Sequence, residues 1–596
     1  MLRGRFLSFR GDGCDRQGLP PLRVILIWGN RQLVLHRRAS ERALGGVQFH
    51  RTFTTGWGLK WITVRAEWAD GTTSVVRRFL AVRWGRRPPS PYVRDYAFFL
   101  RRNEPTATDV EELARTVAAL PEQPLVSVLM PTYNTPPRFL EKAIQSVVNQ
   151  RYEHWELCVA DDGSTSRGAR RVLRRWQERD DRIRVQMRAS NGHIVAASRT
   201  ALAMAQGEWV ALFDHDDVLK PESLLRMVLE MNRQPHADFL YSDEDKIDRM
   251  GQRFSPYFKP DWNPLLLDSQ NYICHFAMIR RREMEAVGGF RSGTDGVQDW
   301  DLFRRLGNHL PRSSILHIPE VLYHWRSLPG STAHRIGEKA YVVEAGRNAL
   351  EHEDSGGEPA TRELVAGMYW VRKYESCHNY QILRYRSDRP DRPLEAGCNA
   401  NLSPGVVVLL PEGMSEEPMA CASLAGWASN PELGLVAGSL LREDGGVAEG
   451  GLLLQEDGDV RPILRDLDPH YEGMGRRELL PQNLLVPGRW FLALRRDLWE
   501  ASEEDWPKDV LSWTHAVAIF SLRLAEKGYL HAFVPRIGIR APVPSADQKP
   551  KDLTKMLEGW PEWCRADPGG NPNLTIESGL WTLQMDKKVP RDWSGP

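Results

Sequence analysis

WVALFDHDD, residues 209–217, is an apolar run that ends abruptly on acids. The apolar part predicts a buried strand, because continuous runs of this kind are typical of strands covered on both faces. Asp214, Asp216 and Asp217 then follow its carboxyl end, where open α/β sheets bind their ligands. Hard divalent cations prefer carboxylate oxygens, so this Asp-x-Asp stretch predicts a metal site. The alternative role, an acidic cap on the next helix, we assign to Asp217 alone.

The strands upstream of this stretch also end on polar residues. LVSVLMP (125–131) runs into the Tyr-Asn pair at 133–134, and WELCVA (155–160) is closed by the Asp pair at 161–162. Strands that alternate with helical patterns predict an α/β domain. The carboxyl ends of its strands would form a crevice of nucleotide size. Each polar cluster alone is also an ordinary turn or helix cap, so the prediction depends on all of them together.

The pattern along the chain predicts six segments. They are a small β-sandwich-like accessory module (1–90), a helical linker (91–122), an α/β domain (123–345), a linker (346–380), a second α/β-like domain (381–545) and a C-terminal tail (546–596). Short alternating strands separated by Gly-Asn, Gly-Gly and Asp-Gly turns indicate the first module. The helical linker should contain two helices, 92–102 and 108–120, with Thr106 or Thr108 as the N-cap of the second.

Composition limits the partners of the chain. Its 596 residues carry a net charge of only +1, so the overall field favours neither nucleic acid nor a membrane surface. No two of the seven cysteines have C-x-x-C spacing. No apolar run approaches the ~18 residues that span a bilayer, and the first residues lack the apolar core of a signal peptide. We expect a cytoplasmic protein that binds no nucleic acid, either soluble or peripherally associated with the inner face of the cell membrane.

Four motifs between about Pro124 and Thr332 together resemble a known family. They are SVLMPTYN (127–134), ADDGST (160–165), LFDHDD (212–217) and QDWDL (298–302). In this order they resemble the family-2 inverting glycosyltransferases, which implies the α/β GT-A fold, a Rossmann-like fold of nucleotide-diphospho-sugar transferases. YSDEDKID (241–248) and HIPEVLYHWRSLPGST (317–332) are similar to bacterial O-antigen and surface-polysaccharide enzymes of the rhamnosyltransferase type.

The resemblance implies a role for each matched position. Asp299 is expected to be the catalytic base, because an acceptor hydroxyl must lose its proton as it attacks the sugar. The nucleotide sugar is expected to contact Pro131, Thr132, Tyr133, Asp161, Asp162 and Asp214. Mg²⁺ or Mn²⁺ is expected on Asp214, Asp216 and His324, although a lone histidine is as often structural.

The segment 381–545 resembles a second, weaker copy of the α/β domain. GVVVLLPEGM (405–414) has the form of WVALFDHDD, and WFLALRRDLWEA (490–501) parallels HFAMIRRREMEAVGG (275–289). The acids are absent: Pro411-Glu412-Gly413 stands at the Asp-x-Asp position, and Val517 stands where Asp299 is expected. We expect a degenerate, non-catalytic GT-A-like domain. The alternative is an unrelated α/β region.

The leading hypothesis is therefore an inverting, metal-dependent hexosyl- or rhamnosyl-transferase. It would use a nucleotide-sugar donor and a glycan or lipid-linked saccharide acceptor to build a bacterial surface polysaccharide. One alternative is an inactive glycan-binding scaffold, against which Asp214, Asp216 and Asp299 argue. The other is a sugar nucleotidyltransferase, which would need a glycine-rich basic loop after its first strand, whereas PTYNTPPRF (131–139) provides none.

Overall fold

The computed structural model describes side chains continuously from Tyr96 to Ser327. Beyond Ser327, side chains are described in residues 344–350, 374–386, 405–443, 446–454, 460–464, 480–507, 512–541 and 567–576, and at a few isolated positions outside these ranges. Further helices and strands are described by their backbone. Most of the expected linker sequence EHEDSGGEP lies outside the described residues. The chain divides into two compact units, Met1–Arg94 and Asp95–Pro596.

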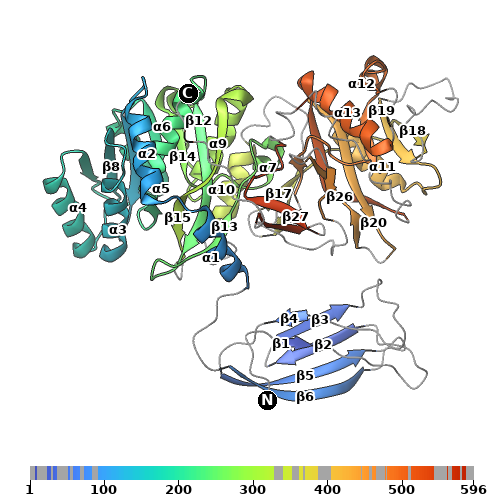
Figure 1. Ribbon diagram of the computed structural model, residues 1–596, viewed down its shortest axis with the longest axis horizontal. Coiled ribbons are helices and arrows are strands. Elements are labelled where there is room, and N and C mark those ends of the chain that lie inside the picture. Colours follow the sequence, from blue (N-terminus) through green and yellow to red (C-terminus); the bar gives the residue numbers. More distant parts are fainter. Residues whose placement is uncertain are drawn as a thin grey trace. The chain divides into compact units, whose positions relative to one another are not determined.

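The first unit is made of strands (Figure 1). Its four-stranded antiparallel sheet has the order β3-β2-β5-β6, formed by β2 (Arg23–Trp28), β3 (Arg31–His36), β5 (Gly58–Glu67) and β6 (Thr73–Arg83). A two-stranded sheet joins β1 (Leu7–Phe9) to β4 (Arg51–Phe53). The alternating segments of the sequence correspond to β2 through β6.

The second unit begins with two helices. They are α1 (Pro91–Asn103) and α2 (Ala107–Ala118). The hydroxyl of Thr106 accepts the backbone N–H of Asp109 at 3.2 Å, and the Asp109 carboxylate accepts the N–H of Thr106 at 2.7 Å. This capping box fixes the start of α2 and identifies Thr106 as the N-cap.

A nine-stranded mixed sheet follows, which confirms the predicted α/β class. Its order is β11-β15-β12-β14-β10-β7-β8-β9, and β13 pairs with β12. The strands are β7 (Val126–Thr132), β8 (Trp155–Asp161), β9 (Ile183–Met187), β10 (Trp209–Leu212), β11 (Val218–Leu219), β12 (Phe239–Ile247), β13 (Arg253–Tyr257), β14 (Ala277–Arg280) and β15 (Ile315–Arg326). Strands β10, β7, β8 and β9 run parallel, whereas β14 is antiparallel to both β10 and β12.

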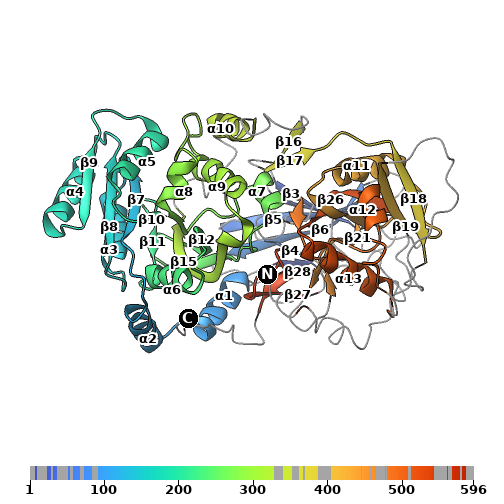
Figure 2. The same ribbon diagram turned by 90° about the horizontal axis from the view of Figure 1, so that it is seen from above.

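Helices cover both faces of this sheet (Figure 2). They are α3 (Pro137–Val148), α4 (Arg167–Arg179), α5 (His193–Met204), α6 (Ser223–Arg233), α7 (Pro264–Ser269), α8 (Arg281–Ala286), α9 (Gln298–His309), the 3-10 turn η1 (Arg312–Ser314) and α10 (Ala340–Glu351). The buried strand residues divide between two cores. Val128 and Met130 of β7 lie in one, and Leu129 of the same strand lies in the other, because successive side chains point to opposite faces.

A second mixed sheet, of seven strands, has the order β18-β19-β25-β20-β26-β24, and β21 pairs with β20. Its strands are β18 (Tyr380–Tyr385), β19 (Val406–Pro411), β20 (Leu433–Leu441), β21 (Val447–Glu449), β24 (Gln482–Asn483), β25 (Leu492–Arg495) and β26 (Leu530–Arg540). Its helices are α11 (Pro418–Ala428), α12 (Arg496–Ala501) and α13 (Trp513–Glu526). Three hairpins complete the unit: β16 (Thr361–Ala366) with β17 (Tyr369–Lys373), β22 (Leu452–Leu454) with β23 (Val460–Pro462), and β27 (Leu574–Glu577) with β28 (Leu580–Leu583).

The second sheet repeats the central part of the first, strand for strand. The order β18-β19-β25-β20-β26 matches β7-β10-β14-β12-β15, with the same alternation of parallel and antiparallel pairs. Residues 386–405 join β18 to β19, whereas residues 133–208 join β7 to β10 and contain β8, α4, β9 and α5. The shorter connection is too short to hold all of these elements together with α3, and the described part of the second sheet contains no counterparts of β8 and β9.

None of the helices in the described part of the chain has both the length and the apolar character required to cross a membrane.

Candidate active site

An Asp-Asp-His cluster lies at the carboxyl end of β10. Asp214 and Asp217 follow this strand, and His275 precedes β14, the antiparallel neighbour of β10. One ligand atom from each of these residues lies within 4.8 Å of the other two. The Nε2 atom of His275 lies 3.4 Å from Oδ2 of Asp214. Two of the acids that follow β10 thus lie close to a histidine that precedes the neighbouring strand.

Asp217 is fixed by the far strand of the sheet rather than by the next helix. The Tyr323 hydroxyl donates to its Oδ2 at 2.6 Å, and the backbone N–H of Arg326 donates to its Oδ1 at 2.6 Å. Helix α6 begins at Ser223 with Glu222 as its N-cap, so the prediction that Asp217 caps this helix was wrong. Burial, then the charges of Asp216 and Asp214, raise the pKa of Asp217 well above its ordinary value.

Asp216 lies on the same turn and is more exposed than Asp217. Its backbone carbonyl accepts a hydrogen bond from Nε of Arg326 at 2.6 Å, and its carboxylate lies 3.6 Å from Nδ1 of His215. Burial raises the pKa of Asp216; His215 opposes this effect and the neighbouring Asp214 adds to it. The turn thus concentrates three carboxylates whose repulsion a divalent cation would relieve.

His275 is held between two acids and a tyrosine ring. Its Nδ1 lies 3.3 Å from Oε2 of Glu244, opposite the Asp214 contact. The imidazole stacks on Tyr323 with ring centroids 4.6 Å apart. Burial alone would lower the pKa of His275, but Asp214 and Glu244 outweigh it and raise the pKa well above the ordinary value. A carboxylate behind a ligating histidine is the usual arrangement in metal sites.

A buried lysine holds the segment that carries His275. The ammonium of Lys259 donates to the backbone carbonyls of Ser242 at 2.7 Å and Ile273 at 2.6 Å, and also to that of His275. It lies 3.3 Å from Oε2 of Glu244, which accepts the backbone N–H of His275 at 3.0 Å. Lys259 has no exposed surface. Because its hydrogen bonds go mainly to backbone carbonyls, it fixes the course of residues 271–275, which we call the bridging loop.

The bridging loop also reaches Asp299. The Asn271 side-chain amide donates to Oδ2 of Asp299 at 2.7 Å, and Oδ1 of Asn271 accepts the backbone N–H of Cys274 at 3.1 Å. Asp299 lies in the first turn of α9. Burial raises the pKa of Asp299, while His275 and the Asn271 hydrogen bond act in the opposite direction. One short loop therefore contacts the predicted base at one end and the acidic cluster at the other.

The residues expected to contact the nucleotide lie at the ends of β7 and β8. Pro131 and Thr132 end β7, with the Thr132 hydroxyl buried against Thr135 at 2.7 Å. Tyr133 presents its ring to solvent and is 46% exposed. In the adjoining loop, Oδ1 of Asn134 accepts the N–H groups of residues 165 and 166, both at 2.9 Å. The two strand ends are thus joined into one surface.

The two acids at the end of β8 have different partners. Asp162 accepts Nε of Arg188 at 2.8 Å and the backbone N–H of Gly192 at 3.0 Å. Asp161 accepts the N–H of Ser164 at 3.2 Å through Oδ2, whereas its buried Oδ1 has no protein partner. A buried acceptor without a partner is costly, so Oδ1 of Asp161 is the oxygen of this pair available to a bound ligand.

His324 does not join the cluster of Asp214, Asp217 and His275. Its Nδ1 lies 2.5 Å from Oδ1 of Asp245, and Oδ2 of the same carboxylate accepts the Tyr96 hydroxyl at 2.6 Å. Tyr323 and Trp325, its neighbours on β15, contact His275 instead. Since successive strand residues alternate between faces, the side chain of His324 points to the other face of the sheet. The expected metal set of Asp214, Asp216 and His324 is thus not assembled among the described residues.

The donor set present fits Mg²⁺ or Mn²⁺. Carboxylate oxygens suit both ions, and a neutral imidazole suits Mn²⁺. Asp214, Asp217 and His275 supply these groups close together, and Asp216 lies on the same turn. Sequence reasoning missed His275, Glu244 and Asn271. The motif SQNYICH (269–275) contains two of them, but no spacing within it predicts contacts to residues 214, 244 and 299.

Strand register allows the same positions to be located in the second domain. Leu212 pairs with Ala277 and Leu409 pairs with Leu492, so residues 214, 216 and 217 correspond to 411, 413 and 414. These are Pro411, Gly413 and Met414. Counting back along β14 and β25 from the same pairs, His275 corresponds to Trp490.

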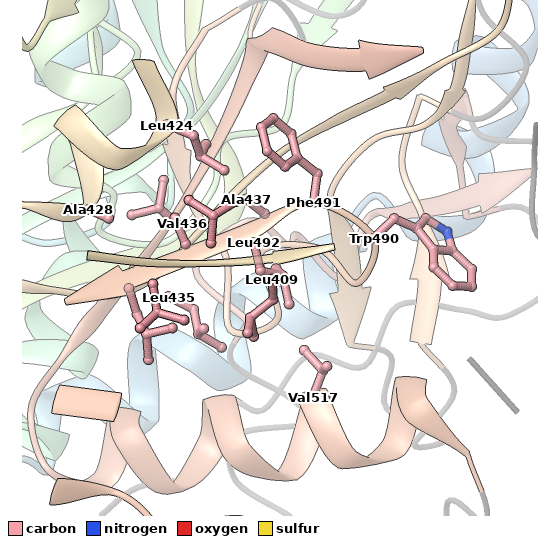
Figure 3. Close-up of a cluster of buried hydrophobic side chains, with 14 of the residues drawn as sticks. Leu409, Leu424, Ala428, Leu435, Val436, Ala437, Trp490, Phe491, Leu492 and Val517 are labelled. Carbon is pink, nitrogen blue, oxygen red and sulfur yellow. The ribbon is translucent and has the colours of Figure 1, made fainter. Parts of the chain in front are cut away.

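The interior of the second domain is apolar where the first has its acids. Val517, at the position aligned with Asp299, projects from α13 toward the sheet beside Leu409 and Leu435 (Figure 3). It is 1% exposed and belongs to the main core of this domain, as do Leu409 and Leu435.

Parts of the chain are similar to known proteins. Residues 127–288 match the family model described as glycosyl transferase family 2. An uncharacterized protein of Sinorhizobium fredii, y4gI, is 44% identical over 239 residues, which cover 40% of this chain and 26% of that protein. The O-antigen biosynthesis protein RfbC of Myxococcus xanthus is 36% identical over 346 residues, which cover 57% of this chain and 27% of that protein. The chain spans about a quarter of the length of each of these two relatives.

A solved structure, that of TarS residues 1–349 from S. aureus, aligns with a TM-score of 0.32 at 17% sequence identity. The alignment covers 39% of this chain and 66% of that one.

Proposed function

Because residues 127–288 form a family-2 glycosyltransferase domain, we propose that this protein is an inverting, metal-dependent glycosyltransferase. It transfers a sugar from a nucleotide-sugar donor to a glycan or lipid-linked saccharide during the synthesis of a bacterial surface polysaccharide. The observation that carries the proposal is the bridging loop, whose two ends contact Asp214 and Asp299 through His275 and Asn271. The name of the relative RfbC supports the O-antigen-like pathway.

Asp214, Asp217 and His275 would hold Mg²⁺ or Mn²⁺, with Asp216 on the same turn. The cation supplies charge neutralisation for the diphosphate leaving group. Arg326 keeps the turn in place, because its backbone N–H and Nε bond Asp217 and Asp216 from β15. Glu244 and Lys259 fix the orientation of His275 from the opposite side.

Asp299 is the proposed base. Its carboxylate takes the proton of the acceptor hydroxyl as the oxygen attacks the anomeric carbon on the face opposite the leaving group, which inverts that centre. The raised pKa of Asp299 makes it a stronger proton acceptor than an exposed aspartate. The Asn271 amide orients one carboxylate oxygen and leaves the other for the acceptor.

The nucleotide would lie across the ends of β7 and β8. Tyr133 offers an exposed ring for stacking on the base, with Pro131 and Thr132 behind it. Oδ1 of Asp161 accepts a hydrogen bond from the base, while Asp162 maintains the pocket through Arg188 and Gly192. The site works in the cytoplasm, and a lipid-linked acceptor would bring the protein to the inner face of the membrane.

The test is a transfer assay over a panel of nucleotide sugars with Mn²⁺ or Mg²⁺, in which the anomeric configuration of the product is read by NMR. Wild type is compared with Asp214→Ala, Asp216→Ala and Asp299→Asn. We expect one donor to be used, an inverted product, and loss of transfer in Asp214→Ala and Asp299→Asn. A wild type that binds glycan but uses no donor would support the alternative of an inactive scaffold and refute the enzyme.

A further inference from the structure

Helix α7 belongs to the cores of both large domains. Leu266 and Leu267 are buried in a core cluster of the catalytic domain, whereas Leu265 packs against the main core of the second domain. In the other direction, Leu480 of the second domain is buried in the catalytic-domain cluster. The helix contacts α9 on one side and both β24 and β17 on the other. Both ribbon views show α7 beside α9 and β17 (Figures 1 and 2).

A reciprocal pair of asparagines joins α7 to the second domain. Oδ1 of Asn263 accepts the backbone N–H of Asn483 at 2.8 Å, and Nδ2 of Asn263 donates to the Asn483 carbonyl at 2.9 Å. In return, Oδ1 of Asn483 accepts the backbone N–H of Leu265 at 3.1 Å. Asn263 is also the N-cap of α7, through the N–H of Leu266 at 3.2 Å. Both asparagines are buried, so each lost hydrogen bond would leave an unsatisfied polar group.

From α7 the contacts continue to the catalytic helix. The indole N–H of Trp300 donates to the Leu267 carbonyl at 2.6 Å, and Arg304 donates to Asp268 at 2.7 Å. Trp300 directly follows Asp299, and Asn271, two residues beyond α7, donates to the Asp299 carboxylate. A helix of six residues is not stable by itself. Its position therefore depends on the two domains that enclose it.

A second connection reaches the bridging loop from the C-terminal segment. Nδ2 of Asn571 donates to the Lys259 carbonyl at 2.8 Å and to both oxygens of Asp243, at 3.1 and 3.2 Å. Asp243 in turn accepts the backbone N–H of Lys259 at 2.7 Å. The ammonium of Lys259 then bonds the Ile273 carbonyl within the bridging loop. Two separate parts of the C-terminal half thus reach the same loop.

We propose that the second domain is a positioning element for catalysis, which holds Asn271 against Asp299 through the Asn483–Asn263 pair and α7. The proposal rests on the glycosyl transfer proposed above and adds a role for the domain that lacks the acids. Asn483 and Asn263 are positioning residues, because neither contacts Asp299. Simple packing would require apolar contact only, whereas here four directed hydrogen bonds join one asparagine pair and α7.

The experiment compares two alanine variants of the full-length protein. Asn483→Ala removes the acceptor for Leu265 and the donor to the His531 carbonyl. Asn430→Ala is the matched control: it also removes a side-chain amide of the second domain, bonded to the Tyr374 hydroxyl at 3.0 Å and to the backbone N–H of Glu432 at 2.9 Å. We expect kcat to fall roughly tenfold to a hundredfold in Asn483→Ala, with donor KM within about twofold, because positioning affects the reacting geometry. Asn430→Ala should keep the wild-type kcat.

A double-mutant cycle with Asn271→Ala tests whether the two asparagines act through one another. If Asn483 acts through Asn271, the double variant should lose little more kcat than Asn271→Ala alone. Both single variants should also move the acid limb of the pH–rate profile upward, because the Asn271 hydrogen bond lowers the pKa of Asp299. The other groups that act on Asp299, His275 and Asp214, are unchanged in these variants.

Hydrogen–deuterium exchange gives a readout that does not depend on turnover. Asn483→Ala should accelerate exchange in residues 264–275, and Asn430→Ala should not. Equal exchange in that segment, or equal kcat loss in the two variants, would overturn the positioning role. A wild type that uses no donor, while exchange still responds in Asn483→Ala alone, would refute the proposed transfer and leave the structural coupling supported.

Discussion

The two large domains share a strand order but not an interior. At the carboxyl end of β10 the first domain has Asp214 and Asp217, whereas the corresponding end of β19 in the second domain has Pro411 and Met414. Asp299 lies on α9 of the first domain, whereas the residue aligned with it, Val517, lies on α13 of the second (Figure 3). The strand framework therefore does not require buried acids. Where the acids are present and buried, they must be compensated by specific partners.

The compensation comes from long-range contacts. In the first domain Lys259 and His275 offset the charges of Glu244 and Asp214, and Tyr323 and Arg326 satisfy Asp217. In the second domain Trp490 stands at the position of His275, and it lies in an apolar core that also contains Leu492. The difference shows what the acidic cluster requires of this fold. The charged groups are buried, and a network of hydrogen bonds must satisfy them.

Exchanging the pair Asp299 and Val517 should give the largest effect. Asp299→Val should lower kcat by roughly 10²–10⁴, the usual contribution of a general base, because no other group takes the acceptor proton. The variant should remain folded, since Val517 is accommodated at the aligned position of the second domain. Steady-state transfer and thermal unfolding measure the two properties. Transfer within a few-fold of wild type would contradict the assignment of the base.

The reverse exchange, Val517→Asp, should affect stability rather than chemistry. It places an unpaired carboxylate in an apolar core, which should lower the free energy of unfolding by roughly 3–5 kcal/mol. The folded fraction should keep the wild-type kcat, because Val517 lies in the core of the second domain and not at the site. Urea denaturation followed by fluorescence measures the loss. A change below about 1 kcal/mol would show that this core tolerates charge.

At the position of His317 the two domains differ in a side chain whose contribution to stability depends on pH. Nε2 of His317 lies 2.9 Å from Asp243 and Nδ1 lies 2.9 Å from Asp261, whereas the register places Phe533 at the equivalent position. Burial lowers the pKa of His317, but Asp243 and Asp261 raise it to about 9. A raised pKa stabilises the folded state fully below the unfolded value near 6.5, and this contribution is lost as pH rises through about 9.

His317→Phe should therefore lose about 3 kcal/mol of stability at pH 6, and the difference from wild type should shrink toward pH 10. The matched control is His531→Phe. Burial lowers the pKa of His531 to about 4, so its imidazole is uncharged over this range. The cost of His531→Phe should not change between pH 6 and 10. Denaturant unfolding at several pH values measures both, and parallel curves for the two variants would contradict the charged state of His317.

The smallest effect should come from the carboxylate behind His275. Glu244→Gln should weaken Mn²⁺ binding by roughly 10–100-fold, because partners of this kind orient a ligating histidine. Glu449→Gln provides the control: Glu449 is equally buried and is paired with Arg489 at 2.7 Å, but it lies in the domain without acids. Isothermal titration with Mn²⁺ measures both variants. Equal affinities in Glu244→Gln and wild type would remove His275 from the metal site.

Local patterns predicted the elements well. WVALFDHDD placed Asp214 at the end of a buried strand, and the capping pattern limited the N-cap to Thr106 or Thr108, of which the structure has Thr106, because both signals lie within a few neighbouring residues. The α/β class followed from the alternation of strands and helices. The register of β10 and β19 also makes Pro411-Glu412-Gly413 equivalent to the Asp-x-Asp stretch, in agreement with the alignment of the two sequence segments.

The partners of the acids were beyond local prediction. Asp217 looked like a helix cap, but its partners are Tyr323 and Arg326, more than a hundred residues away on β15. His275 has no motif around it that indicates a ligand, and it faces Asp214 only because β14 pairs antiparallel with β10. His324 lies in a motif from which metal binding was expected, but its partner in the structure is Asp245. Strand pairing decides such contacts, and a single sequence does not specify it.

Because α7 packs in the cores of both large domains, it limits how the two domains can be recombined. Its residues lie in the first half of the chain, yet Leu265 fills a position in the core of the second half. If the chain after the linker were replaced by that of a related protein, β24 would change while the original Leu265 and Asn263 would remain. Functional chimeras of this architecture should therefore require residues 263–265 to be inherited together with residue 483, as a unit that is discontinuous in the gene.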